Sequence, residues 1–98
     1  MRTMFKVTVP TEAGNKAITD GSLPSTIKNF LETYKPEAAY FSVDGGERTA
    51  FFVADVAEPA QLPVMLEPFF MNLGARISYT PVMTAQDLAR GLAMLAGK

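Results

Sequence analysis

Histidine, cysteine and tryptophan are all absent from the 98 residues of this chain. Without cysteine there can be no disulfide and no thiolate nucleophile, and without histidine there is no Ser–His–Asp triad. Zinc sites in proteins also rely mainly on these two residue types. We therefore expect no metal site, and any chemistry would be carried by carboxylates, tyrosines, lysines or arginines.

Charge is also scarce, because Asp, Glu, Lys and Arg make up 19% of the chain against about 25% in ordinary domains. Nine basic and ten acidic residues give a net charge of −1 and are scattered singly, so no basic patch suits nucleic acid or an anionic membrane. The longest strongly apolar stretch, Ala50 to Ala54, is far shorter than the ~20 residues of a membrane span. Lys6 and Thr8 stand where a signal peptide would be apolar. We expect a cytoplasmic protein that binds neither nucleic acid nor membrane.

The first third of the chain predicts one strand and two helices. Met4 to Val9 alternates apolar and polar residues, as a half-buried strand does, and Pro10 ends it. Thr11 to Asp20 predicts a short helix, and Ser22 is the expected N-cap of the next helix, which closes at Pro36. The apolar stripe of that second helix consists of Leu23, Ile27, Phe30, Leu31 and Tyr34.

A hairpin is predicted in the middle of the chain, where Ala38 to Val43 and Arg48 to Val56 flank Gly45-Gly46. Paired glycines permit the positive φ angles of a two-residue hairpin loop. That loop places Tyr40 opposite Phe51 on one face of the sheet and leaves both faces largely apolar. We therefore expect both faces of the hairpin to be covered.

The last third predicts two helices around one strand. Pro59 to Leu73 has helical spacing with Gly74 as its C-cap, and Pro68 is expected to kink or divide that helix. The expected apolar stripe consists of Leu62, Leu66, Phe69, Phe70 and Leu73. Ala75 to Val82 alternates as a strand. The final helix is expected to be capped by Thr84 and to carry an apolar stripe of Leu88, Leu92 and Leu95.

The resulting order, β-α-β-β-α-β plus a C-terminal helix, is that of an α+β ferredoxin-like domain spanning residues 1–98. The usual antiparallel sheet order is 4-1-3-2, with both long helices on one face. The open face would then expose Tyr40, Phe51 and Val53, a large apolar patch for a monomer. Together with the low charge, this predicts that a second copy covers it.

The stretches 35–41, 48–52, 67–70 and 81–83, which read KPEAAYF, RTAFF, EPFF and PVM, are similar to a group of small uncharacterised bacterial proteins. These resemble the dimeric α+β barrel superfamily, in which two ferredoxin-like protomers pack sheet against sheet. The resemblance covers nearly the whole chain and implies a homodimer. The superfamily includes cofactor-independent monooxygenases, muconolactone-isomerase-like enzymes, haem-handling enzymes and ligand-sensing regulatory domains, so the fold leaves the function open.

Our leading hypothesis is a homodimer that binds a small apolar or aromatic ligand between the two sheets and needs no cofactor. The expected ligand-binding residues are Lys6, Tyr40, Ser42, Phe51, Val53 and Ser78. The alternative is a cofactor-independent monooxygenase or isomerase in which Asp55 or Glu67 is the base and Tyr40 or Arg76 stabilises an enolate or phenolate. Against this, Asp55 can simply form a structural ion pair with Lys6 or Arg76, across neighbouring strands or at the rim of the dimer. A third hypothesis is a structural or regulatory dimer without a ligand.

Three other functions have weaker support in the sequence. RNA-recognition motifs share this element order, but Thr49, Ala50 and Asp55 replace the glycine and two aromatic residues of their third strand. Haem binding lacks its usual histidine ligand, which leaves only tyrosine or methionine. The six methionines are interpreted as core residues rather than a soft-metal site.

Overall fold

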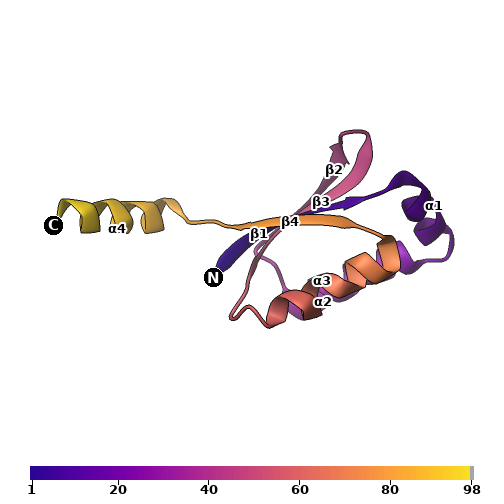
Figure 1. The fold of residues 1–98 in the computed structure, drawn as a ribbon, viewed down its shortest axis with the longest axis horizontal. Helices are drawn as coiled ribbons and strands as arrows, with labels where there is room; N and C mark the ends of the chain where they lie inside the picture. The colour runs from indigo at the N-terminus through magenta and orange to yellow at the C-terminus, as the bar shows by residue number, and fades with distance from the viewer. Residues whose placement is uncertain (98) are drawn as a thin grey trace.

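The computed structural model of the protein, which describes residues 1–97, has an α+β fold with one four-stranded antiparallel sheet (Figure 1). The strands lie in the order β2-β3-β1-β4, which confirms the predicted order and is compatible with a ferredoxin-like fold. The elements are β1 (Arg2–Val9), α1 (Thr11–Thr19), α2 (Ser22–Tyr34), β2 (Ala38–Asp44), β3 (Glu47–Asp55), α3 (Gln61–Leu73), β4 (Arg76–Pro81) and α4 (Ala85–Ala96). None of the helices described has the length and apolarity that crossing a membrane requires.

The hairpin between β2 and β3 has the predicted register. Gly45 and Gly46 adopt positive φ angles of 62° and 79°, a region that residues with a side chain rarely occupy. Tyr40 is paired with Phe51, and the register continues across β1, where Phe51 is paired with Lys6. The alternation of side chains along all four strands therefore assigns each residue to one of two faces.

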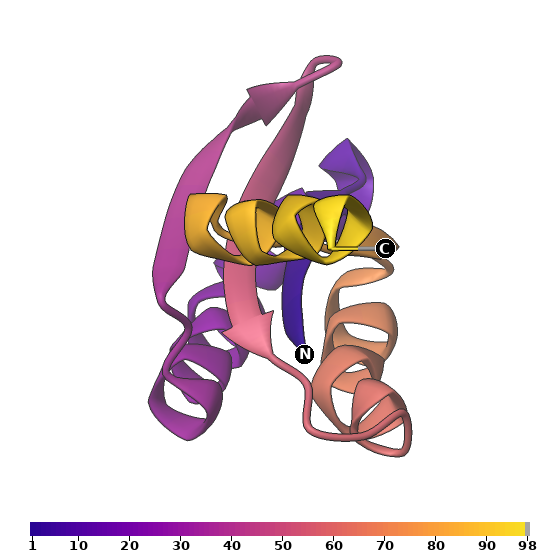
Figure 2. The ribbon, with the colours of Figure 1, turned by 90° about the vertical axis from the view of Figure 1, so that its left-hand side faces the viewer.

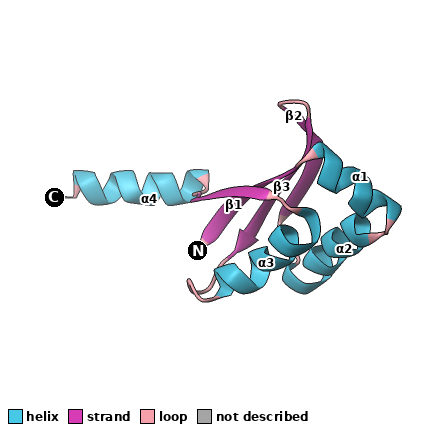
Figure 3. Ribbon diagram, turned by 45° about the vertical axis from the view of Figure 1, so that its right-hand side comes forward, coloured by secondary structure: helices cyan, strands magenta, loops and turns pink. Residues whose placement is uncertain are grey.

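Helices α2 and α3 lie side by side against one face of the sheet (Figure 3). The core between them contains a cluster of aromatic rings. The ring centroid of Phe30 in α2 lies 4.7 Å from that of Phe52 in β3 and 5.2 Å from that of Phe69 in α3. Phe5 of β1 and Phe52 are fully buried. This layer covers one face of the sheet and leaves the other uncovered.

The expected N-cap of α2 is wrong, and of the two effects expected of Pro68, a kink or a division of its helix, the division does not occur. Ser22 is the first residue of α2, and the N-cap is Gly21, whose φ of 82° is left-handed. Ser22 instead donates its backbone N–H to Asp20 Oδ1 at 2.8 Å. Pro68 does not divide α3, which runs without a break from Gln61 to Leu73. A proline leaves the carbonyl four residues earlier, here that of Val64, without its helical hydrogen bond, and Val64 lies on the exposed side of α3 at 67% exposure.

The buried face of α3 also differs from the predicted stripe. Phe70, expected in the core, is 41% exposed, whereas Met65 is 1% exposed. Met65, Leu66, Phe69 and Leu73 form the buried face. The predicted and observed buried faces differ by a small rotation about the helix axis. Because nearly every residue of α3 is apolar, its sequence does not determine which face is buried.

Helix α4 projects from the end of β4 away from the other elements (Figure 1) and stands in front of the sheet when viewed from that side (Figure 2). It begins as predicted, because Thr84 and Asp87 form a reciprocal capping box. None of its residues is buried. The chain measures 57 × 28 × 17 Å and has a radius of gyration of 15.9 Å, against ~13 Å for a compact chain of this length.

Candidate functional site

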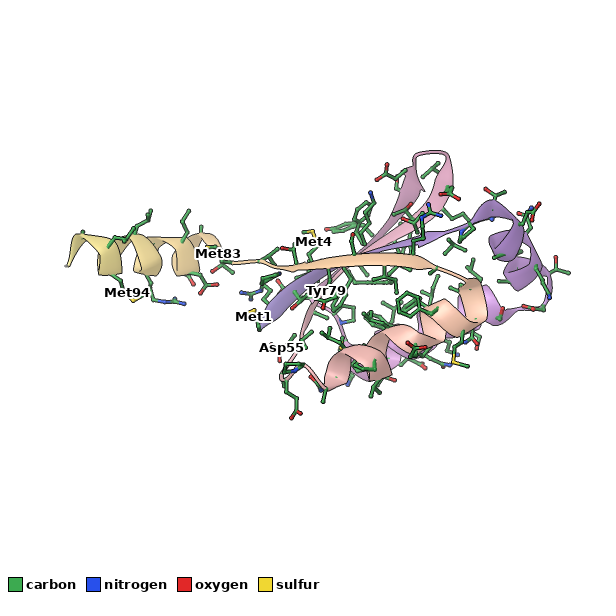
Figure 4. All side chains as sticks on the ribbon, in the orientation of Figure 1. Met1, Met4, Asp55, Tyr79, Met83 and Met94 are labelled. Atoms are coloured by element: carbon green, nitrogen blue, oxygen red, sulfur yellow. The ribbon has the colours of Figure 1, made fainter. Side chains whose placement is uncertain are left out.

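The uncovered face of the sheet has an apolar centre. We call Met4, Ala38, Tyr40, Phe51 and Val53 the apolar band. Val53 is paired with Met4 on one side and with Ala38 on the other, and Tyr40 is paired with Phe51, so the five side chains are neighbours on three strands. Tyr40 is 70% exposed and Met4 is 40% exposed. Figure 4 shows Met4 on the side of the sheet away from α2 and α3.

Two ion pairs border the apolar band toward the hairpin. Lys6 Nζ lies 2.7 Å from Asp44 Oδ2, so this pair spans the intervening strand β3. Arg76 of β4 pairs with Glu47 of β3 and spans β1 in the same way. Thr49, on the same face of β3, is only 4% exposed. These pairs cover the hairpin end of the face and balance its charges.

A second group of ion pairs borders the apolar band at the opposite end. Arg2 pairs with Glu37, and its Nη1 lies 3.6 Å from Asp87 Oδ2 at the start of α4. The hydrogen bond and charge of Glu37 raise the pKa of Arg2, which keeps the guanidinium positive. The amino group of Met1 lies 3.0 Å from Asp55 Oδ1. An apolar strip between two charged borders is thus the main feature of this face.

All six expected ligand-binding residues lie on this face. The register places Lys6 between Phe51 and Ser78, with Tyr40 beyond Phe51. Ser42 follows Tyr40 on the same face of β2, and Val53 follows Phe51 on β3. The two serines and Tyr40 are exposed, whereas Phe51 and Val53 are half-buried. The face therefore offers an aromatic centre with hydroxyl groups beside it.

The expected catalytic residues are not brought together. Glu67 lies exposed on α3, which packs against the other face of the sheet. The Asp55 side chain is 76% exposed and pairs with the Met1 amino group. The expected ion pair with Lys6 or Arg76 is wrong, because these two cations pair with Asp44 and Glu47 nearer the hairpin. Arg76 is on the uncovered face with Tyr40 but pairs with Glu47. No carboxylate among these candidates is enclosed together with a proton donor.

A pocket of about 280 Å³ lies under the end of the sheet, on the helix side, and was not expected from the sequence. We call it the Tyr79 pocket. Tyr79 contributes to its wall from the edge strand β4 and remains 52% exposed, and its ring centroid lies 6.0 Å from that of Phe5 (Figure 4). The other lining residues are Met1, Thr3, Val56, Ala57, Glu58, Pro59, Leu62 and Pro81. Tyr79 is paired with the buried Phe5, so it lies on the helix-side face, but alternation along the strand gives no sign that an edge position leaves space around the ring.

Within residues 1–97, no three His, Cys, Asp or Glu side chains are grouped so that they could hold a metal ion. No protein-family model matches the sequence. No curated protein matches it either. The features of the structure that bear on function are therefore the fold, the apolar band and the Tyr79 pocket.

Proposed function

We propose that the protein is a homodimer of the dimeric α+β barrel type, in which the uncovered faces of two sheets pack together and hold a small apolar or aromatic ligand between them. The supporting observation is the apolar band, which is exposed at Tyr40 and Met4 and bordered at both ends by paired charges. An apolar centre within a polar rim is the usual composition of a protein interface. Because the ion pairs lie at the two borders of the band, they can stay at the solvated rim of the interface and need not lose their water.

The exposed area of the chain supports the same assembly. One protomer exposes 6474 Å², about 1,000 Å² more than the ~5,500 Å² expected for a folded monomer of its mass. A stable interface of standard size buries ~800 Å² on each partner. The excess therefore matches what a protomer needs to contribute to a dimer.

The chemistry of the face indicates the class of ligand. Tyr40 and Phe51 offer ring faces on which a flat apolar molecule can stack, and Met4 adapts to irregular shapes. The hydroxyls of Ser42 and Ser78 can orient a polar substituent, as the few polar groups of ligand pockets do. Nothing in the geometry favours the acid–base alternative, because Asp55 and Glu67 are both exposed and lie on different sides of the sheet.

Light scattering of the full chain tests the assembly. We expect a particle of twice the protomer mass of 10.6 kDa at micromolar concentration, and a monomer there would overturn the proposal. The ligand part is tested with 2-naphthol as the probe, followed by the amide resonances of Tyr40 and Phe51. Resonance changes confined to Tyr79 and Leu62 would move the ligand site to the Tyr79 pocket and overturn its placement between the sheets. No binding of 2-naphthol up to millimolar concentration would favour the dimer without an apolar ligand.

A further inference from the structure

A long apolar groove follows the β2 edge of the sheet on the helix side. We call it the α2–β2 groove. Its outer part is an open depression of about 500 Å³ between α2 and β2, and its inner part, of about 220 Å³, continues under the sheet toward β3 and β1. Leu23, Ile27 and Phe41 line both parts, so the two parts form one groove. Figure 2 shows α2 beneath the edge of the sheet that β2 forms.

The walls of the groove suit an extended hydrocarbon chain. Phe41 is 54% exposed, and its ring packs edge-on against Phe52 with the centroids 5.9 Å apart, which holds the ring in place as a wall. On the other wall, Leu23, Ile27 and Leu31 of α2 follow one another at intervals of four residues and are half-buried. At 1.5 Å per helical residue this apolar wall is ~12 Å long, about the length of a ten-carbon chain.

A fixed cation lies at the inner end of the groove. Arg48 of β3 lines the inner part and is half-buried. Its Nη2 donates to Asn15 Oδ1 of α1 at 3.0 Å. The absence of a side chain at Gly14 leaves room for Nη1, which would lie 2.5 Å from a Cβ at that position. The guanidinium is therefore held between β3 and α1 and is not free to move into solvent like an exposed arginine.

The charge of Arg48 is not compensated within residues 1–97. Arg2 and Arg76, the other two arginines of the sheet, each pair with a glutamate. Arg48 takes part in none of the ion pairs of this part of the chain, and the side chain of Asn15 that it contacts is neutral. A guanidinium has five N–H donors, so donors as well as charge remain for an anion that enters the groove.

The outer end of the groove carries charges of both signs. Lys28 and Glu32 line it, and both are exposed on α2. Because they are four residues apart on one helix, each can compensate the charge of the other. The groove is thus apolar along its length, balanced at the outer end and positive at the inner end. This polarity fits an amphipathic molecule with one anionic head.

We propose that the α2–β2 groove binds a saturated fatty acid of about ten carbons, with its carboxylate on Arg48 and its chain along Ile27, Leu31 and Phe41. The carboxylate would accept charge-assisted hydrogen bonds from the guanidinium. The chain would cover apolar surface that the protomer leaves open to water. The groove lies on the opposite side of the sheet from the apolar band, so this site does not depend on the proposed homodimer.

Calorimetric titration of the full chain with decanoate and with decyltrimethylammonium tests the proposal, because the two probes share the chain length and differ in the sign of the head group. We expect decanoate to bind at least ~10-fold more tightly and to shift the amide resonances of Ile27 and Phe41. Equal affinities would show that Arg48 does not select the head group and would overturn the proposal, as would no binding of decanoate at millimolar concentration. Shifts confined to Phe51 and Val53 would place the chain on the apolar band instead and would also overturn it.

Three variants test where the two ends of the fatty acid lie. Arg48→Gln should lower the affinity for decanoate at least ~10-fold, with no loss for decyltrimethylammonium. Lys28→Gln is the matched control at the outer end and should leave the affinity for decanoate unchanged; the reverse pattern would overturn the assigned orientation. Arg48 also contacts α1, so urea denaturation checks that Arg48→Gln is folded. Phe41→Ala leaves α1 untouched and should weaken binding of both probes at least ~5-fold, and wild-type affinity in this variant would overturn the groove as the site.

Discussion

Replacing Tyr40 with alanine should weaken the dimer strongly while leaving the protomer folded. Tyr40 stands in the middle of the apolar band, and 70% of its surface is exposed in the isolated protomer. For a side chain of ~200 Å² this is ~140 Å² per copy, or ~3.5 kcal/mol per copy at ~25 cal/mol per Å² if all of it were covered. Covering half of that area in both copies contributes ~3.5 kcal/mol per dimer, equivalent to ~300-fold in the dissociation constant.

Sedimentation velocity over a range of protein concentrations measures this dissociation constant for wild type and for Tyr40→Ala. Met71→Ala is the matched control, because Met71 is 80% exposed but belongs to α3, on the far side of the sheet. The free energy of unfolding of the protomer should change little in either variant, since exposed positions usually shift it by less than ~0.5 kcal/mol. A Tyr40→Ala protein with the wild-type dissociation constant would refute the assignment of the apolar band as the interface.

Three further predictions concern the protomer. Phe52→Ala, which empties a fully buried position in the aromatic cluster, should lower the free energy of unfolding by ~3–5 kcal/mol in urea denaturation, and a loss under ~1 kcal/mol would contradict the packing described. Thr84→Ala removes the side-chain acceptor of the α4 capping box and should destabilise the start of α4 by ~1 kcal/mol, seen as faster amide exchange confined to that helix. The backbone and side chain of Thr84 lower the pKa of Asp87, and Ser22 lowers the pKa of Asp20 in the same way, so both carboxylates should titrate below 3.8 in a carbon-detected NMR titration. Because the folded-state pKa of each carboxyl is lowered, each carboxylate stabilises the fold at pH values above its unfolded pKa, and this stabilisation is lost as the pH falls through the folded pKa. A titration midpoint above 3.8 for either residue would contradict the hydrogen bonds.

Much of the sheet could be predicted from local signals. Two consecutive glycines determine where the hairpin turns, and a two-residue loop leaves one register, which pairs Tyr40 with Phe51. Once the register is known, alternation assigns every side chain of β2 and β3 to a face. The apolar band could be predicted for this reason, because it consists of strand residues whose direction depends on parity alone.

The helices were less predictable because their orientation depends on the surface that they pack against. Along α3 nearly every position is apolar, so Phe70 and Met65 compete for the same face and only the sheet decides between them. The start of α2 shows a different limit. Ser22 is a good capping residue, but the left-handed turn at Gly21 ends α1 and begins α2 within one residue, which moves Ser22 into the helix.

Helix α4 shows why composition and fold must be considered together. Its leucine stripe predicts a packed helix, yet within its own protomer it touches no core and buries no residue. The same disagreement occurs at the apolar band, where Tyr40 is exposed among apolar neighbours. In both places apolar side chains occupy exposed positions that ordinary domains fill with charged residues. These positions are one reason why charged residues make up only 19% of the chain. A second copy placed across the sheet would cover the band, and the exposed leucines of α4 are a second surface at which apolar residues stand in place of charge.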